Sequence, residues 1–271
     1  MSISRVPFAA VSNEEIYAFR LDGDTVIPTE YSRGPWFDDQ QHGAAVCGLM
    51  ARFLERVPSA QPMRFTRITT DMSRPVPMVP CKVTARPLRD GRRVQSLEAI
   101  LEVDDKIVGR AVATRIRVEP GLVPADKVAP VYPEDEPPPW IAEESGYPQA
   151  NTSFHDCIEV RGGLDDDKLR GLSWLRLRHP LIKDEAPSPL VRLASVSDFV
   201  HSSAARLGRD WISINPEVSL QVERDMVGEW VAIQATVRLD DDGLGVSEAV
   251  LFDRHRRVGR TSKSTLNMPR A

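Results

Sequence analysis

The sequence has few of the features that mark secreted proteins, membrane proteins or nucleic-acid binders. Its three cysteines, Cys47, Cys81 and Cys157, are scattered and odd in number, which argues against a disulfide framework and indicates a reducing compartment. The formal net charge is −4, without the basic excess that is typical of a dedicated nucleic-acid binder. No apolar run approaches the roughly 20 residues of a membrane span, and residues 1–17 lack the apolar core of a secretory signal. We therefore expect a cytoplasmic protein that binds neither nucleic acid nor membrane.

Several common catalytic motifs are also missing. There is no G-x-S-x-G elbow, which disfavours a serine hydrolase. There is no G-x-G-x-x-G and no Walker A motif, which disfavours nucleotide-dependent chemistry. His155 and His179 show no metal-ligand spacing with cysteine, aspartate or glutamate. We expect no metal and no cofactor.

What is present is the composition of a soluble globular protein, with 41% hydrophobic and 27% charged residues. The length suits one large domain or two ordinary ones. Residues 118–150 hold eight of the 22 prolines, a density that excludes regular helix and central strand. We predict an N-terminal domain at 1–117, a proline-rich linker at 118–150 and a C-terminal domain at 151–271.

Both halves of the chain show the same order of elements. In the first half, a helix at 42–57 is apolar on nearly every face over its first two turns, which predicts burial. In the second half, Ser188 is a good N-cap and Pro189 fits the first position of a helix ending at Gly208. Alternation and turn residues predict a hairpin at 15–30 and strands at 64–74, 81–88, 93–103, 107–118, 152–161, 172–178, 212–224, 229–239, 246–253 and 258–268.

An internal repeat relates the two halves at an offset of 150 residues. The matching segments are Glu98–Leu101 with Glu248–Leu251, Val108–Arg110 with Val258–Arg260, and Arg74 with Arg224. At this offset the two helices coincide, and Asp198 falls opposite Gly48. A solvent-facing aspartate is not expected opposite a glycine of a buried helix. Asp198 is therefore a candidate site residue.

Five segments resemble the thioesterase II family of acyl-CoA thioesterases. They are GPWFDDQQHGAA at 34–45, RPVP at 74–77, VSDF at 196–199, Glu223-Arg224 with GEW at 228–230, and LFD at 251–253 with Val258-Gly259. The likeness spans residues 15–117 and 152–270. It implies an α+β, double-hotdog fold with two tandem antiparallel sheets, each wrapping a long central helix.

The resemblance also implies hydrolysis of an acyl-CoA thioester by a water that an aspartate, a hydroxyl residue and a glutamine hold in place. Asp198 occupies the aspartate position, whereas Asn215 replaces the hydroxyl residue and Lys263 the glutamine. Asparagine can still donate and accept hydrogen bonds. Lysine has three donors and no acceptor, so Lys263 either pairs with Asp198 or stabilises an oxyanion.

Further residues are candidates for binding the substrate, for which the resemblance implies acyl-CoA. His42 and Gly43 lie at the first helix start, which lines the acyl-CoA groove in the family. Ser219 is another candidate, and an apolar tunnel between helix and sheet is expected for the acyl chain. The CoA phosphates need basic groups, for which the candidates are Arg257, Arg254, Arg256 and Lys263. The resemblance further implies a homodimer or higher homo-oligomer and a role in lipid metabolism.

Two other functions are compatible with this sequence. Because the glutamine and the hydroxyl residue of the family are replaced, the chain could be a non-catalytic acyl-CoA or acyl-carrier binding protein on the same fold. A hotdog hydratase or dehydratase would need a paired acid and base, for which Asp198 and His201 are candidates. The thioesterase hypothesis is the first of the three.

Overall fold

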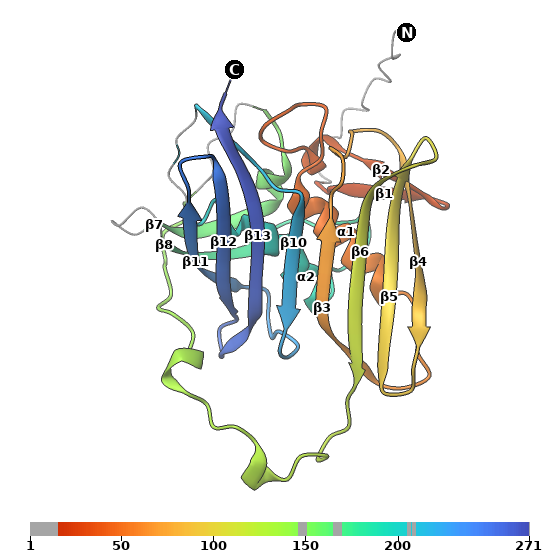
Figure 1. The fold of residues 1–271 in the computed structure, drawn as a ribbon, viewed down its shortest axis with the longest axis vertical. Helices are drawn as coiled ribbons and strands as arrows, with labels where there is room; N and C mark the ends of the chain where they lie inside the picture. The colour runs from red at the N-terminus through yellow and green to blue at the C-terminus, as the bar shows by residue number, and fades with distance from the viewer. Residues whose placement is uncertain (1–15, 146–150, 165–169, 205–206, 208–209, 271) are drawn as a thin grey trace.

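One large antiparallel sheet with two helices on one side forms the structure (Figure 1). This computed structural model describes residues 16–145, 151–164, 170–204, 207 and 210–270. The strand order is β1-β2-β4-β5-β6-β3-β10-β13-β12-β11-β8-β7, and β9 pairs with β13. The expected α+β class is confirmed, but in place of two separate sheets the halves join through β3 and β10 into one.

The first half follows the predicted order. It contains β1 Phe19–Asp22, β2 Thr25–Pro28, a 3-10 turn Glu30–Ser32, α1 Gly43–Glu55, β3 Met63–Asp71, β4 Cys81–Asp90, β5 Val94–Val103 and β6 Lys106–Arg117. After β6 the chain crosses below the sheet with two 3-10 turns, Ala125–Lys127 and Pro133–Asp135 (Figure 1). In the described chain no helix is long and apolar enough to span a membrane.

The second half repeats the arrangement with three differences from the prediction. It contains a 3-10 turn Phe154–Cys157, β7 Ile158–Leu164, β8 Arg170–Leu177, α2 Pro189–Ser197, a 3-10 turn Asp198–Val200, β9 Trp211–Ile214, β10 Glu217–Val222, β11 Val231–Leu239, β12 Leu244–Phe252 and β13 Arg257–Pro269. The strand predicted from residue 152 begins only at Ile158, because Ser153 caps the 3-10 turn before it. The other two differences concern the candidate site.

The first of these is the end of α2, which was predicted to continue to Gly208, a residue outside the described chain. The α-helix ends at Ser197. In a continuous helix the carbonyls of residues 197 and 198 would accept from N–H groups four residues on. Instead, the Thr261 hydroxyl donates to the Ser197 carbonyl at 3.1 Å and the Lys263 ammonium donates to the Asp198 carbonyl at 2.6 Å. Two side chains of β13 therefore end the helix.

The second is the strand predicted at 212–224, which is two strands. β9 ends at Ile214 and β10 begins at Glu217. Pro216 lies in the break and has no N–H for a sheet ladder, and its carbonyl accepts from the Met72 N–H at 2.7 Å. The break leaves the Asn215 side chain free to leave the sheet.

The sheet preserves the offset of 150 residues. β5 and β12 begin at 94 and 244, and both ladders shift register at corresponding places, Leu101/Glu102 and Leu251/Phe252. Where the halves meet, Thr69 of β3 pairs with Ser219 of β10, which is its counterpart in the repeat. A residue that pairs with its own counterpart lies on a pseudo-two-fold axis, so the halves are related by rotation.

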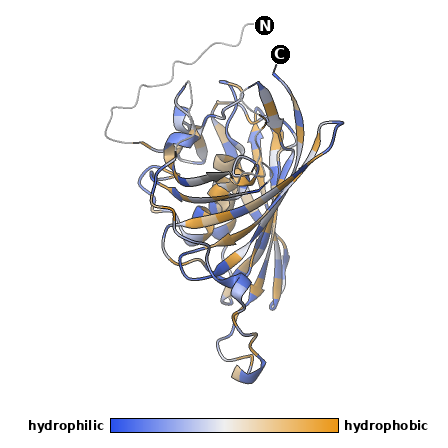
Figure 2. Cartoon of the chain, turned by 90° about the vertical axis from the view of Figure 1, so that its left-hand side faces the viewer, coloured by the Kyte–Doolittle hydropathy of each residue, from blue (hydrophilic) through white to orange (hydrophobic). Residues whose placement is uncertain are grey.

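The main core lies between the sheet and the helices, and polar and apolar residues alternate along the strands (Figure 2). The helices are antiparallel, since the N-cap Ser188 of α2 donates to Glu55 at the end of α1 at 2.6 Å. They pack without a gap at Gly48, where a Cβ would overlap the Ser195 hydroxyl and lie 2.9 Å from Leu181 Cδ2. Glycine at position 48 is required by this close approach.

We predict that Gly48→Ala destabilises the protein by about 1–3 kcal/mol through overpacking, although alanine is otherwise the better helix former by about 1 kcal/mol. Guanidinium unfolding measures the change. Ser195→Ala alone should be nearly neutral, because its hydroxyl has no hydrogen-bond partner among the described residues. Combined with Gly48→Ala it should recover part of the loss. An unchanged or raised midpoint for Gly48→Ala would contradict the packing described here.

Candidate active site

Asp198 lies where α2 ends, and its side chain is buried with 5% exposure. Its Oδ1 accepts from Lys263 Nζ at 2.7 Å and from Asn215 Nδ2 at 3.1 Å. Asn215 is itself held by a bond from Nδ2 to the Glu217 carbonyl at 3.2 Å. The three residues predicted to carry the chemistry therefore meet in one cluster. Of the two roles open to Lys263, the structure shows the pairing with Asp198.

The second oxygen of Asp198 faces the N-terminus of α1. A Cβ on Gly43 would lie 2.8 Å from Asp198 Oδ2, so glycine lets the carboxylate approach the helix start. The bonds from Lys263 and Asn215 both go to Oδ1. Oδ2 is therefore the oxygen that can accept a proton or a hydrogen bond from a water or a substrate. It lies beside the positive, N-terminal end of α1.

His42 caps α1 beside this carboxylate. Its Nδ1 accepts from the Ala44 N–H at 3.0 Å, so this nitrogen carries no proton and the neutral ring is protonated at Nε2. Its 3.5 Å approach to Asp198 Oδ2 is therefore not a hydrogen bond. Phe199 stacks on the ring with centroids 5.1 Å apart. Burial lowers the pKa of His42 to about 4, outweighing the opposite effect of Asp198, so the ring is neutral at pH 7.

The pKa of the Asp198 carboxyl reflects two opposed effects. Burial favours the neutral acid and would raise this pKa, but the Lys263 ammonium and the hydrogen bonds from Lys263 and Asn215 favour the carboxylate. The net shift is downward from 3.8. Asp198 is therefore ionised at neutral pH, and it is a weaker base than a buried carboxylate without a cationic partner.

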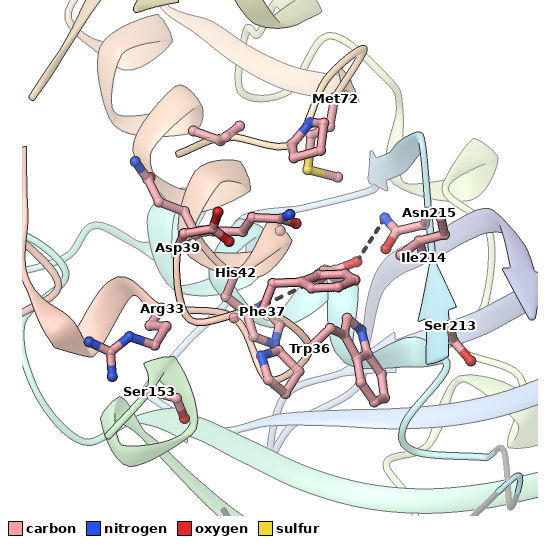
Figure 3. Close-up of a pocket in the computed structure, with 18 of the residues that line it drawn as sticks. Arg33, Trp36, Phe37, Asp39, His42, Met72, Ser153, Ser213, Ile214 and Asn215 are labelled. Carbon is pink, nitrogen blue, oxygen red and sulfur yellow. Dashed lines mark hydrogen bonds and ion pairs between the residues drawn. The ribbon is translucent and has the colours of Figure 1, made fainter. Parts of the chain in front are cut away.

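A cavity of about 1230 Å³ opens onto this cluster. Figure 3 shows Arg33, Asp39 and His42 on one side of it and Ile214 and Asn215 on the other. Trp36 and Phe37 come from the loop before α1, and Met72, Pro75 and Val76 from the segment after β3. The volume of the cavity exceeds the roughly 300–1,000 Å³ of pockets that take a drug-sized ligand.

Two more histidines line the cavity: His155, which the sequence did not assign to the site, and His201, the candidate partner of Asp198 in the hydratase hypothesis. His155 meets His42 edge to face with centroids 5.0 Å apart, and burial holds its pKa well below 6.5. His201 forms a 3.0 Å hydrogen bond between its Nδ1 and the Ser247 hydroxyl, and burial lowers its pKa to about 4. Among the hydrogen bonds of the described residues, His201 has none with Asp198, its expected partner in the hydratase hypothesis. Spacing in the sequence carries no signal for His155, because tertiary packing brings it here from a distant segment.

Ser219 and Arg257, predicted to bind substrate, are not among the residues that line the cavity. Ser219 faces Thr69 across the β3–β10 junction at 3.3 Å between hydroxyls. Arg257 pairs with Glu223 at 2.9 Å, and the Arg254 guanidinium lies 4.2 Å from the Trp140 ring centre. Lys263 is buried rather than at a cavity mouth. The arginines that do line the cavity are Arg33, Arg74 and Arg270.

The architecture, a long antiparallel sheet carrying two helices, is shared with hotdog-fold proteins. A conserved protein of unknown function with hot dog fold from Alicyclobacillus acidocaldarius has a TM-score of 0.71 at 16% identity, covering 94% of this chain and 97% of that chain. An acyl-CoA thioesterase II, TesB2, from Mycobacterium marinum has a TM-score of 0.65 at 14% identity, covering 93% and 94%. A tesB protein from Mycobacterium avium subs paratuberculosis has a TM-score of 0.64 at 17% identity, covering 93% and 96%. These likenesses define the fold.

Family models define the relationship more closely. The model of the acyl-CoA thioesterase N-terminal domain matches residues 32–116, and that of the C-terminal domain matches residues 125–266. The chain belongs to the acyl-CoA thioesterase family. Comparison with curated proteins gives no match.

The buried His42 predicts that the protein loses stability in mild acid. Its pKa is about 4 when folded and 6.5 in the unfolded reference, so the unfolded chain takes up the proton first as pH falls. The stabilisation is complete at neutral pH and is lost between these two values, by about 2 kcal/mol at pH 4.5.

His42→Asn tests this, because asparagine retains the N-cap and does not titrate. The wild type should lose about 2 kcal/mol more than the variant between pH 7 and pH 4.5 in its free energy of unfolding. Equal losses would show that His42 is not buried in neutral form.

Proposed function

We propose that the protein hydrolyses acyl-CoA thioesters with a water held by Asp198. The observation that carries this proposal is Asp198 itself, a buried carboxylate with one oxygen held by Lys263 and Asn215 and the other facing the start of α1 inside a large cavity. The family assignment supports acyl-CoA as the substrate.

The scaffold that we propose is a double hotdog. Each half contributes one helix and its own set of strands, and the offset of 150 residues supports duplication of one unit. Domain boundaries at 1–117 and 151–271, with a linker between them, fit the end of β6 at Arg117 and the start of β7 at Ile158. A cytoplasmic location, a role in lipid metabolism and assembly into a homodimer or higher homo-oligomer stay predictions.

In the proposed reaction the thioester carbonyl lies in the cavity, beside both Asp198 Oδ2 and the first turn of α1. The Gly43 N–H and the positive end of the helix polarise the carbonyl oxygen. Water bonded to Asp198 Oδ2 attacks the carbonyl carbon, and Asp198 takes its proton. The carbon–sulfur bond then breaks, and that proton passes to the CoA thiolate, which leaves a carboxylic acid and free CoA.

Lys263 and Asn215 act by positioning the carboxylate. Their bonds fix Oδ1 and so direct Oδ2 to the water, and Lys263 offsets the cost of burying the negative charge. For the phosphates of CoA we propose Arg33, Arg74 and Arg270, since these line the cavity whereas Arg257 does not. Asp38 and Asp39 also line it.

Asp198→Asn should lower kcat for CoA release by about 10²-fold or more, because the amide is nearly the same shape but cannot take a proton. Thiol release from acetyl-, butyryl-, octanoyl- and palmitoyl-CoA measures it. Asp225→Asn, at an exposed ion pair with Arg64, is the matched control and should leave kcat unchanged. Full turnover by folded Asp198→Asn would remove Asp198 from the mechanism.

Lys263→Gln should move the acid limb of the kcat/KM profile to higher pH by about one unit. The ammonium that lowers the pKa of Asp198 is lost while the burial that raises it remains. Lys82→Gln, on the exposed side of β4, controls for loss of a charge. An acid limb that does not move would show that Lys263 leaves the basicity of Asp198 unchanged.

The non-catalytic alternative has one observation in its favour, the lowered basicity of Asp198 beside Lys263. Acyl-CoA binding by calorimetry with no thiol release across the same esters would support it. Release from any ester that Asp198→Asn abolishes would exclude it.

A further inference from the structure

The deep part of the cavity is polar. Eight of its described lining residues are buried, and we call this set the inner wall. Val76 is the apolar member; the others are Gln41, His42, Ser153, His155, His201 and the Asp198–Lys263 pair. Most of the other apolar residues lie toward the rim, where Phe37, Ile214 and Leu266 are 40%, 38% and 47% exposed. Half-buried Met72 is the exception, since its Cε and Asp198 Oδ2 both lie close to where a Gly43 Cβ would stand.

The space between the helices and the sheet is closed to a long acyl chain. Leu49, Met50 and Leu54 of α1 are fully buried in the core, and none of them lines the cavity. The helices meet at Gly48, where Ser195 occupies the space of a Cβ. Between the helices and the sheet, a void beside Cys47, Ser197 and Val218 is too narrow to hold a water molecule. The apolar tunnel expected from the sequence is therefore not open in the described structure.

A saturated chain gains free energy on burial only where it meets apolar surface. Against the inner wall its methylenes would strip water from polar groups without replacing the lost hydrogen bonds. A substrate hydroxyl would replace them, and the Nε2–H of neutral His42 is one donor placed to do so.

We propose that the acyl group cleaved by this protein is short and carries a neutral polar substituent, such as a hydroxyl, that hydrogen-bonds to the inner wall. This rests on the proposed thioesterase function. A neutral group is favoured over a second carboxylate, because the charges of Asp198 and Lys263 offset each other and the histidines are neutral at pH 7.

The test is kcat/KM for CoA release by the wild-type protein from butyryl-, 3-hydroxybutyryl-, succinyl-, hexanoyl-, octanoyl- and palmitoyl-CoA. We expect 3-hydroxybutyryl-CoA to exceed butyryl-CoA by about tenfold and palmitoyl-CoA by about a hundredfold or more. If kcat/KM for octanoyl-, palmitoyl- or succinyl-CoA equalled or exceeded that for 3-hydroxybutyryl-CoA, the proposal would be overturned while the thioesterase function stayed intact.

Absence of release from every ester would overturn the thioesterase function instead. Calorimetry with the corresponding CoA thioethers, which cannot be hydrolysed, then reads the same preference from binding alone. Tightest binding of the 3-hydroxybutyl thioether would support the inner-wall proposal, and tightest binding of a longer alkyl thioether would overturn it.

A variant locates the preference in the inner wall. His201→Phe should lower the ratio of kcat/KM for 3-hydroxybutyryl-CoA over hexanoyl-CoA by about tenfold, whatever its effect on overall activity. His255→Phe, at an exposed histidine of the β12–β13 turn, should leave the ratio unchanged. An unchanged ratio in folded His201→Phe would count against the proposal. If that variant does not fold, the proposal is decided by the wild-type kcat/KM values for the series of CoA esters.

Discussion

The buried contact between Asp198 and Lys263 is the interaction on which the site depends. Both side chains are nearly removed from water, at 5% and 7% exposure, and such a pair is stable only if hydrogen bonds replace the lost solvation. The ammonium meets this requirement by binding both the carboxylate and the carbonyl of Asp198. Lys263 therefore ends α2 together with Thr261, anchors the helix to the sheet and fixes the carboxylate, so one strand, β13, sets both the helix length and the site geometry.

The sequence predicts those features that are set locally. Alternation and turn residues located the strands, and Ser188 with Pro189 located the start of α2. The end of α2 could not be predicted, because the groups that replace its backbone hydrogen bonds, Thr261 and Lys263, lie more than 60 residues away. The break at Pro216 was predictable in principle, since a proline inside a long strand argues against the strand.

The distinction between local and distant determinants also explains which site residues could be predicted from the sequence. Asp198, Asn215, Lys263, His42 and Gly43 were reached through the repeat and the family motifs, and the structure brings them together. Arg257 was chosen because it is one of the basic residues around the last hairpin that could bind the CoA phosphates. It begins β13, however, and six residues at about 3.3 Å each place it some 20 Å from Lys263. The arginines of the cavity come from three distant segments, which only the tertiary fold brings together.

The pseudo-two-fold axis relates the site around Asp198 to an equivalent place in the first half of the chain, but the side chains at the two places differ. The counterparts of Asp198, Asn215 and Lys263 are Gly48, Phe65 and Ala113. No side chain fits at position 48, because Ser195 of the other helix occupies the space. Further along, at the end of α1, Arg115 donates to the Val57 and Pro58 carbonyls and so closes the end of that helix. The two equivalent positions therefore serve different purposes: close helix packing at Gly48 and a buried ion pair at Asp198. For this reason the duplicated fold of this chain has one carboxylate centre of this kind and not two.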